Sequence, residues 1–170
     1  MNIVKLMIVT TCTVMVIGAC ATAGKCKNAP GGKAPEALVI KVGEEVAQLL
    51  FDAEHVSFYI LDNSAEDADA EPFPGYFRHG EGRELTCDQV AVLRFLLPGN
   101  HDNYIPQDGP ILMAPFLPFR EFVFIKGEQR ISLLVSTSDL SWALVRDGQL
   151  LDRFPYMERK TVERLMEVFH

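Results

Sequence analysis

Positive charge is scarce in this sequence of 170 residues. Lysine and arginine together number 16, against 23 aspartates and glutamates, which gives a formal net charge of −7 at pH 7. An acidic protein is repelled by the phosphates of nucleic acid and by anionic lipid headgroups. We therefore expect no nucleic-acid partner and no electrostatic attachment to a membrane surface.

Cysteine is also scarce, since the chain has four. Two of them, Cys12 and Cys20, lie within the first twenty residues, which leaves Cys26 and Cys87 for the rest of the chain. These two could pair in an oxidising envelope, although Cys26 lies in a stretch of linker composition. The sequence leaves open whether Cys26 and Cys87 form a disulfide.

No apolar run in the sequence is long enough and apolar enough to predict a transmembrane helix. The longest, at residues 6–17, contains three threonines and is closed by Gly18, whereas a transmembrane helix needs about 20 apolar residues. It follows the positive charge of Lys5 and ends in small residues. A charged start, a short apolar stretch and small residues are typical of an export signal.

The apolar stretch ends in Ile17, Gly18, Ala19 and Cys20. This run resembles the lipobox of bacterial lipoproteins, in which an aliphatic residue and two small residues precede the cysteine that receives lipid. The resemblance implies a signal peptide at residues 1–19 and lipidation of Cys20. Ordinary signal-peptidase cleavage after residues 21–23, Ala-Thr-Ala, is one alternative, and a retained buried helix is another.

Residues 20–35 are expected to form a lipidated tether. They include Ala-Pro-Gly-Gly at 29–32 and Pro35, without a periodic apolar face, which is typical of a linker. The residue after Cys20 is alanine, and not the aspartate that resembles an inner-membrane retention signal in well-studied lipoproteins. By this resemblance, we expect the protein in the cell envelope, in the outer membrane and facing the periplasm.

Residues 36–170 are long enough for a single domain with its own core. Apolar residues at helical spacing predict helices at 36–51, 86–97 and 156–169. Gly43 weakens the first of these helices. Thr86 and Gln89 form a capping-box pattern at the start of the second. The buried face of the last helix is expected to consist of Val162, Leu165, Met166 and Phe169.

Strand patterns occupy much of the remaining sequence. Residues 56–61 alternate in polarity, and four further runs lie at 121–126, 130–136, 141–146 and 149–154. Asp147 and Gly148 between the last two runs are typical of a two-residue hairpin turn. We expect an α+β fold, with an antiparallel sheet of four to five strands, a meander in 120–154, and helices packed on the sheet. Trp142 is expected in the core.

One segment, 62–71, contains five acidic residues. Calcium binds clustered oxygen ligands, but the spacing differs from that of the twelve-residue calcium loop, which needs a central glycine and a closing glutamate. We interpret this segment as a solvated acidic loop.

Two short motifs contain histidines that point to hydrolysis. Arg78, His79, Gly80 and Glu81 resemble the start of the histidine phosphatases. That chemistry also needs a second histidine, further arginines and a buried strand before the motif. Here residues 72–75, Pro-Phe-Pro-Gly, precede it, and proline is excluded from central strands.

The second motif, at residues 99–102, reads Gly-Asn-His-Asp and resembles a metal-ligand motif of the calcineurin-like phosphoesterases. A two-metal site needs further aspartate and histidine ligands, and the only histidine in the sequence after His101 is His170. We interpret the motif as a polar turn in which Asn100 and Asp102 bond the local backbone. We expect no catalytic residue, no metal ligand and no cofactor. The alternative is a small metal-dependent or histidine-based hydrolase that uses His79 or His101.

The second half of the chain resembles small exported lipoproteins of the Bacteroides group whose function is uncharacterised. The resemblance rests on residues 115–118, Pro-Phe-Leu-Pro, on the strand at 122–124, on Trp142 after the next strand, and on the closing helix. It implies export and lipidation but no activity. Our sequence-based expectation is a lipid-anchored envelope protein, a non-catalytic module that binds an envelope protein or a small molecule.

Overall fold

The computed structural model describes residues 32–62, 72–73, 76–105, 116–154 and 158–170. The expected signal peptide at 1–19, Cys20 and most of the expected tether lie outside these ranges. The elements in chain order are α1 (Glu36–Val42), α2 (Glu44–Asp52), β1 (His55–Asp62), β2 (Pro72–Phe73), β3 (Tyr76–Glu84), α3 (Cys87–Leu96), the 3-10 helix η1 (His101–Tyr104), β4 (Pro118–Lys126), β5 (Gln129–Ser136), β6 (Ser141–Arg146), β7 (Gln149–Phe154) and α4 (Arg159–Val168).

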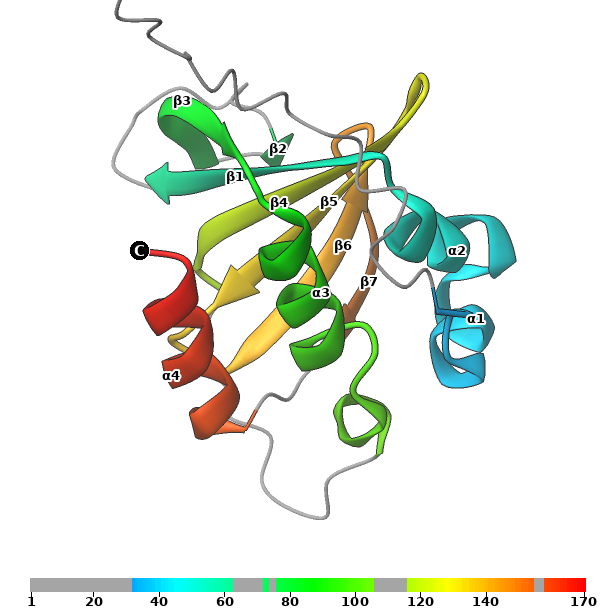
Figure 1. Ribbon diagram of the computed structural model, residues 1–170. Coiled ribbons are helices and arrows are strands. Elements are labelled where there is room, and N and C mark those ends of the chain that lie inside the picture. The colour runs from blue at the N-terminus through cyan, green and yellow to red at the C-terminus, as the bar shows by residue number, and fades with distance from the viewer. Residues whose placement is uncertain (1–31, 63–71, 74–75, 106–115, 155–157) are drawn as a thin grey trace, which may run out of the picture.

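The fold is α+β, as the sequence predicts, and its strands form one antiparallel sheet in the order β2-β3-β1-β4-β5-β6-β7 (Figure 1). The predicted meander in 120–154 is confirmed, because β4 to β7 pair in sequence. The predicted number of four to five strands is too low. Six strands have six or more residues, and the two-residue β2 extends one edge.

β3 accounts for the larger sheet. It pairs with β1 from Ser57 opposite Glu84 to Asp62 opposite Phe77, across an irregularity between Phe58 and Ile60. Its sequence contains two glycines and lacks the alternation of apolar and polar residues that marks a half-buried strand. Pairing with β1, rather than its own pattern, makes this segment a strand.

The turn between β6 and β7 is the expected one. Asp147 and Gly148 both have positive φ, at 52° and 72°, as a two-residue turn whose twist matches that of the flanking strands requires. This connection fixes the pairs next to the turn, with Arg146 opposite Gln149 and Val145 opposite Leu150, before the register shifts at Leu144.

The predicted helix at 36–51 is wrong as a single element, because the chain divides it into α1 and α2 at Gly43. Gly43 has φ 82° and ψ 158°, a backbone conformation that is essentially restricted to glycine. α3 begins as predicted with a capping box. The Thr86 hydroxyl accepts from the Gln89 backbone N–H at 3.3 Å, and the Thr86 N–H donates to Gln89 Oε1 at 3.1 Å.

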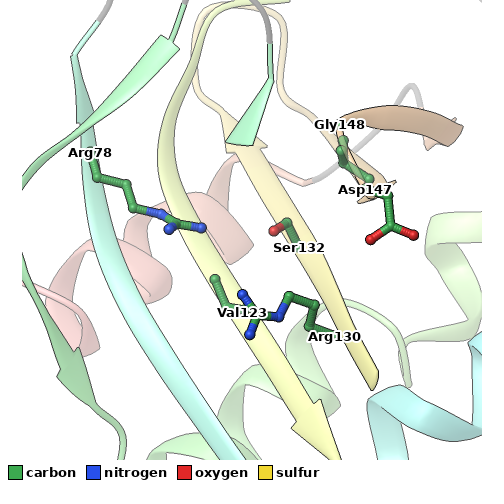
Figure 2. A pocket seen from close by; sticks show the side chains of 7 residues that line it. Arg78, Val123, Arg130, Ser132, Asp147 and Gly148 are labelled. Atoms are coloured by element: carbon green, nitrogen blue, oxygen red, sulfur yellow. The ribbon is translucent and has the colours of Figure 1, made fainter. Parts of the chain in front are cut away.

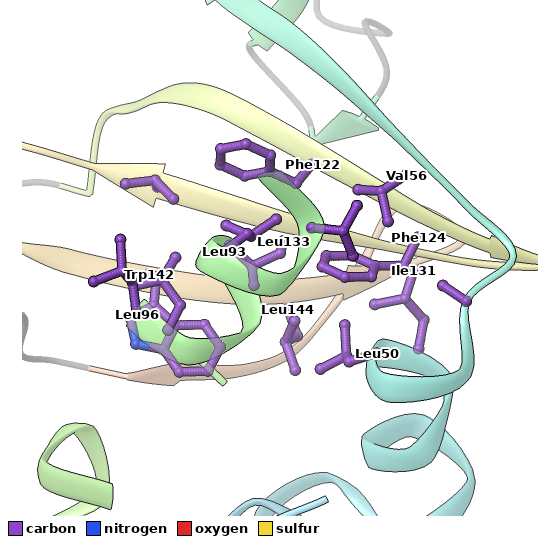
Figure 3. Packing of buried hydrophobic residues seen from close by; sticks show 14 of the residues in the cluster. Leu50, Val56, Leu93, Leu96, Phe122, Phe124, Ile131, Leu133, Trp142 and Leu144 are labelled. Atoms are coloured by element: carbon purple, nitrogen blue, oxygen red, sulfur yellow. The ribbon is translucent and has the colours of Figure 1, made fainter. Parts of the chain in front are cut away.

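The four helices lie on one face of the sheet (Figure 1), and the main core fills the space between them and the strands (Figure 3). Trp142 is fully buried there, as expected, and stacks on Phe154 with 3.8 Å between ring centroids. Val162, Leu165 and Phe169 are buried. The prediction for Met166 is wrong, because its side chain is 39% exposed.

The opposite face of the sheet, called the second face below, carries a smaller apolar cluster. Leu61, Leu134 and Val145 are buried there, and Phe116 packs against them. None of the described helices is long and apolar enough to cross a membrane.

Cys87 is disulfide-bonded at the start of α3. Its partner is outside the described residues, as is Cys26, so the question whether Cys26 and Cys87 pair stays open. Near the other end of the expected tether, Ala34 is buried in the main core. Attachment of the tether to the core therefore begins before α1.

Candidate functional site

The structure places the two histidines of the hydrolase motifs in separate elements. His79 lies in β3 and His101 in η1, and both are exposed. The described residues contain no group of three or more His, Cys, Asp or Glu side chains that could hold a metal ion. The acidic segment lies outside them from residue 63 to 71. In η1, Asn100 Oδ1 accepts from the Asp102 backbone N–H at 3.1 Å, which is the polar-turn bond predicted for Asn100.

Arg78, the arginine of the first motif, has a different role from the one that the phosphatase resemblance implies. Its Nε donates to Glu121 Oε2 at 2.7 Å, and its Nη2 donates to Glu121 Oε1 at 2.9 Å. The guanidinium crosses the intervening strand β1 with its carbon 4.3 Å from the centroid of the Tyr59 ring. Arg78 and Glu121 thus connect β3 and β4, which are not neighbours in the sheet.

Glu121 is fully buried, and both of its carboxylate oxygens are satisfied. The hydroxyl of Ser132 in β5 donates to Glu121 Oε1 at 2.6 Å, beside the two bonds from Arg78. A buried carboxylate is tolerated when its charge is paired and its lone pairs are filled. Arg78, Glu121 and Ser132 form one fixed polar network on the second face.

A pocket of about 260 Å³ adjoins this network (Figure 2). Val123 and Val145 give it apolar walls, and both are buried. The guanidinium groups of Arg78 and Arg130 extend towards the space beside Ser132 and Val123 (Figure 2). The described residues that line the pocket are Arg78, Val123, Arg130, Ser132, Val145, Asp147 and Gly148.

Strand register brings the pocket residues together. In β4 and β5, Val123 lies opposite Ser132, and Ser132 lies opposite Val145 of β6. The three side chains therefore stand in one row across the second face, since directly paired residues point to the same side of a sheet. The turn at Asp147 and Gly148 closes one end of this row, so the hairpin geometry decides how far the pocket extends.

A second polar cluster surrounds Asp139 in the turn between β5 and β6. Its buried carboxylate accepts from the hydroxyls of Ser136 and Ser141 and from the guanidinium of Arg153. Ser136 Oγ also accepts from the Leu117 backbone N–H at 3.2 Å. Leu140 in this turn has φ 53°, a conformation that costs about 1–3 kcal/mol for a non-glycine residue. These bonds hold the turn in place, and we interpret the cluster as structural.

Sequence reasoning missed Glu121, Ser132 and Arg130. It set aside the phosphatase resemblance of Arg78 but gave this residue no other role. Glu121 reads as the polar start of an apolar strand, and Ser132 as an ordinary alternating residue. One signal was available: a carboxylate in a strand otherwise covered on both faces needs a cationic partner. The sequence did not indicate which cation fills that role, because the partner is 43 positions away.

No family model, no curated protein and no solved structure matches this chain. The pocket and its network are therefore interpreted from their own chemistry.

Proposed function

We propose that the protein is a lipid-anchored, non-catalytic binding module of the cell envelope, and that its binding site is the pocket on the second face of the sheet. The observation that carries the proposal is the network beneath that pocket. Arg78 and Ser132 hold both oxygens of the buried Glu121, so the polar wall is ordered before any ligand arrives. Such preorganisation reduces the entropy lost on binding.

The same network supports binding rather than catalysis. A catalytic site needs a nucleophile or a bound metal with converging acid, base and oxyanion groups. Ser132 directs its hydroxyl at Glu121, and that carboxylate is already held through both oxygens by Arg78. The polar groups of the network are thus already hydrogen-bonded to one another. Such a fixed, arginine-containing wall suits recognition of a ligand.

The anchor in this proposal is lipid on Cys20, and it rests on the lipobox resemblance of residues 17–20. Anchoring that is stable needs more than one acyl chain, because a single chain binds membranes only marginally. The location proposed is the outer membrane facing the periplasm, where the partner is an envelope protein or a small molecule. Cys20→Ser should stop palmitate incorporation and release the protein from membrane fractions.

Site-specific photocrosslinking in the native envelope tests the binding site. A photoreactive amino acid replaces Asp147 at the rim of the pocket, and a control places it at Glu163, an exposed position of α4 on the helix side. We expect a discrete adduct, detected by mass, from position 147 and none from position 163.

Two results would count against the proposal. Equal adducts from both positions, or none from position 147, would remove the pocket as the binding site. Hydrolysis of a phosphoester by the purified protein, lost in His79→Ala or His101→Ala, would support the hydrolase instead.

A further inference from the structure

The pocket is lined by two arginines, Arg78 and Arg130, and by one carboxylate, that of Asp147. The charge of Arg78 is matched by Glu121. Arg130 is exposed and its backbone pairs with Ile125 of β4, but its side chain makes no hydrogen bond or ion pair with the described residues. The carboxylate of Asp147 is 82% exposed and lies 4.0 Å from Arg146 Nε, and Arg146 also donates through Nη1 to Glu45 at 3.2 Å. Arg130 is therefore the pocket arginine whose guanidinium makes no ion pair with the described residues.

The shape and walls of the pocket limit what it can hold. Its volume of about 260 Å³ is below the range of roughly 300–1,000 Å³ that is typical of drug-sized ligands. Val123 and Val145 supply two branched apolar surfaces beside Arg130. A ligand that fills this space is small, with an apolar body and one charged end.

We infer that the pocket binds a small aliphatic monocarboxylate, with its carboxylate on Arg130 and its apolar body against Val123 and Val145. The inference rests on the proposed function and names the ligand class for the same site. The planar guanidinium presents paired N–H donors that fit the two oxygens of a carboxylate. Burying a hydrocarbon chain against the two valines contributes a favourable binding free energy of roughly 25 cal/mol per Å² of apolar surface removed from water.

Charge decides between carboxylate and phosphate. Both anions fit an arginine fork, but a phosphate near neutral pH carries up to two charges and no apolar surface. One unmatched arginine beside two valines suits a singly charged group with a hydrocarbon tail. Inorganic phosphate is therefore the discriminating competitor.

Arg130 can be replaced without disturbing the fold, because no described contact depends on its side chain. Exposed substitutions of this kind usually change stability by no more than about 0.5 kcal/mol. Arg164 in α4 provides the matched control, since it is an exposed arginine on the helix side of the molecule. Arg130→Gln and Arg164→Gln remove the same charge from different faces.

The experiment is calorimetric titration of the full chain, purified in detergent, with 3-methylbutanoate. The uncharged 3-methylbutanamide and inorganic phosphate serve as comparison ligands, and amide chemical shifts of Val123, Ser132 and Val145 locate the bound ligand. We expect saturable binding of the carboxylate, no measurable binding of the amide, and a loss of at least about ten-fold in affinity in Arg130→Gln, equivalent to about 1.4 kcal/mol. Arg164→Gln should bind as the unmodified chain does.

Several outcomes would overturn the assignment. These are no saturable binding of 3-methylbutanoate, unchanged affinity in Arg130→Gln, equal binding of the amide, or tighter binding of phosphate at the same amides. Any of them together with a discrete photocrosslink from position 147 refutes the ligand class and keeps the proposed binding module. If no adduct forms from position 147, the pocket is not the binding site and the proposed function is itself refuted.

Discussion

The Arg78 side chain on β3 extends across β1 and donates to both carboxylate oxygens of Glu121 on β4. The distances are 2.7 Å from Nε and 2.9 Å from Nη2. The Tyr59 ring on β1 lies beneath the guanidinium at 4.3 Å. This pair ties together three strands whose backbone bonds link only neighbours. It also supplies the polar wall of the pocket, so sheet stability and site geometry share one interaction.

Removing Arg78 should destabilise the fold strongly. In Arg78→Met, Glu121 is left as a buried charge without its cation, which costs about 3 kcal/mol in comparable pairs. Urea denaturation measures the loss as a lower midpoint at unchanged slope. The control is the double variant Arg78→Met with Glu121→Leu, which removes both charges and should recover much of the stability. A single variant as stable as the unmodified chain would contradict this prediction.

Phe169 should matter more than Met166, although both belong to the same helical stripe. Phe169 is fully buried, with its ring centroid 5.0 Å from that of Phe122 and 6.1 Å from that of Phe58. We expect Phe169→Ala to cost about 3–5 kcal/mol in unfolding free energy. Met166→Ala, at an exposed position, should change it by no more than about 0.5 kcal/mol. Equal losses in the two variants would show that the packing of α4 is misjudged.

Gly43 should resist substitution because of its backbone conformation alone. A Cβ at this position would meet no atom within 4 Å, so any cost of Gly43→Ala comes from its φ of 82° and ψ of 158°. We expect a loss of about 1–3 kcal/mol, measured by thermal unfolding. Gly32→Ala is the control, since its Cβ would make an ordinary contact 3.9 Å from Phe51. A tolerated Gly43→Ala would mean that α1 and α2 can adopt another junction.

Tyr104 should make stability fall at alkaline pH. Its hydroxyl donates to the Pro98 carbonyl at 2.7 Å, and burial raises its pKa above the usual value of about 10. The unfolded chain therefore loses this proton first as pH rises, and deprotonation favours unfolding. The contribution of Tyr104 is complete below about pH 10 and declines as pH rises towards the folded pKa.

Tyr104→Phe isolates that effect from other alkaline titrations. The variant should lose about 1 kcal/mol near pH 7 through the missing hydrogen bond, and its stability should decline less steeply above pH 10. Chemical denaturation from pH 7 to 11 measures both quantities. Parallel stability curves for the two proteins would refute the role assigned to Tyr104.

The sequence predicted those elements whose cause is local. The capping box of Thr86 and Gln89 and the turn at Asp147 and Gly148 each depend on residues within four positions of one another. The meander from β4 to β7 follows from strands joined by short turns, since such strands pair in order.

What the sequence did not predict depends on distant partners. The sequence of residues 73–85 reads as irregular or strand-like, and pairing with β1 decides for a strand. Glu121 meets Arg78 only when β3, β1 and β4 lie side by side. Met166 has the periodicity of a buried residue but lies at the margin of the contact between α4 and the sheet. The pocket combines residues of four strands, β3 to β6, and a turn, so no single segment predicts it.

The sheet separates the main core from the pocket, and that separation bears on how the protein can evolve. Phe169 lies in the main core, and Arg130 lines the pocket on the opposite side of the strands. Substitutions at sites without shared contacts usually have additive effects. A lineage could therefore exchange pocket residues outside the network of Arg78, Glu121 and Ser132, such as Arg130, and acquire a new ligand preference. The packing on the helix side would keep the stability that tolerates such substitutions.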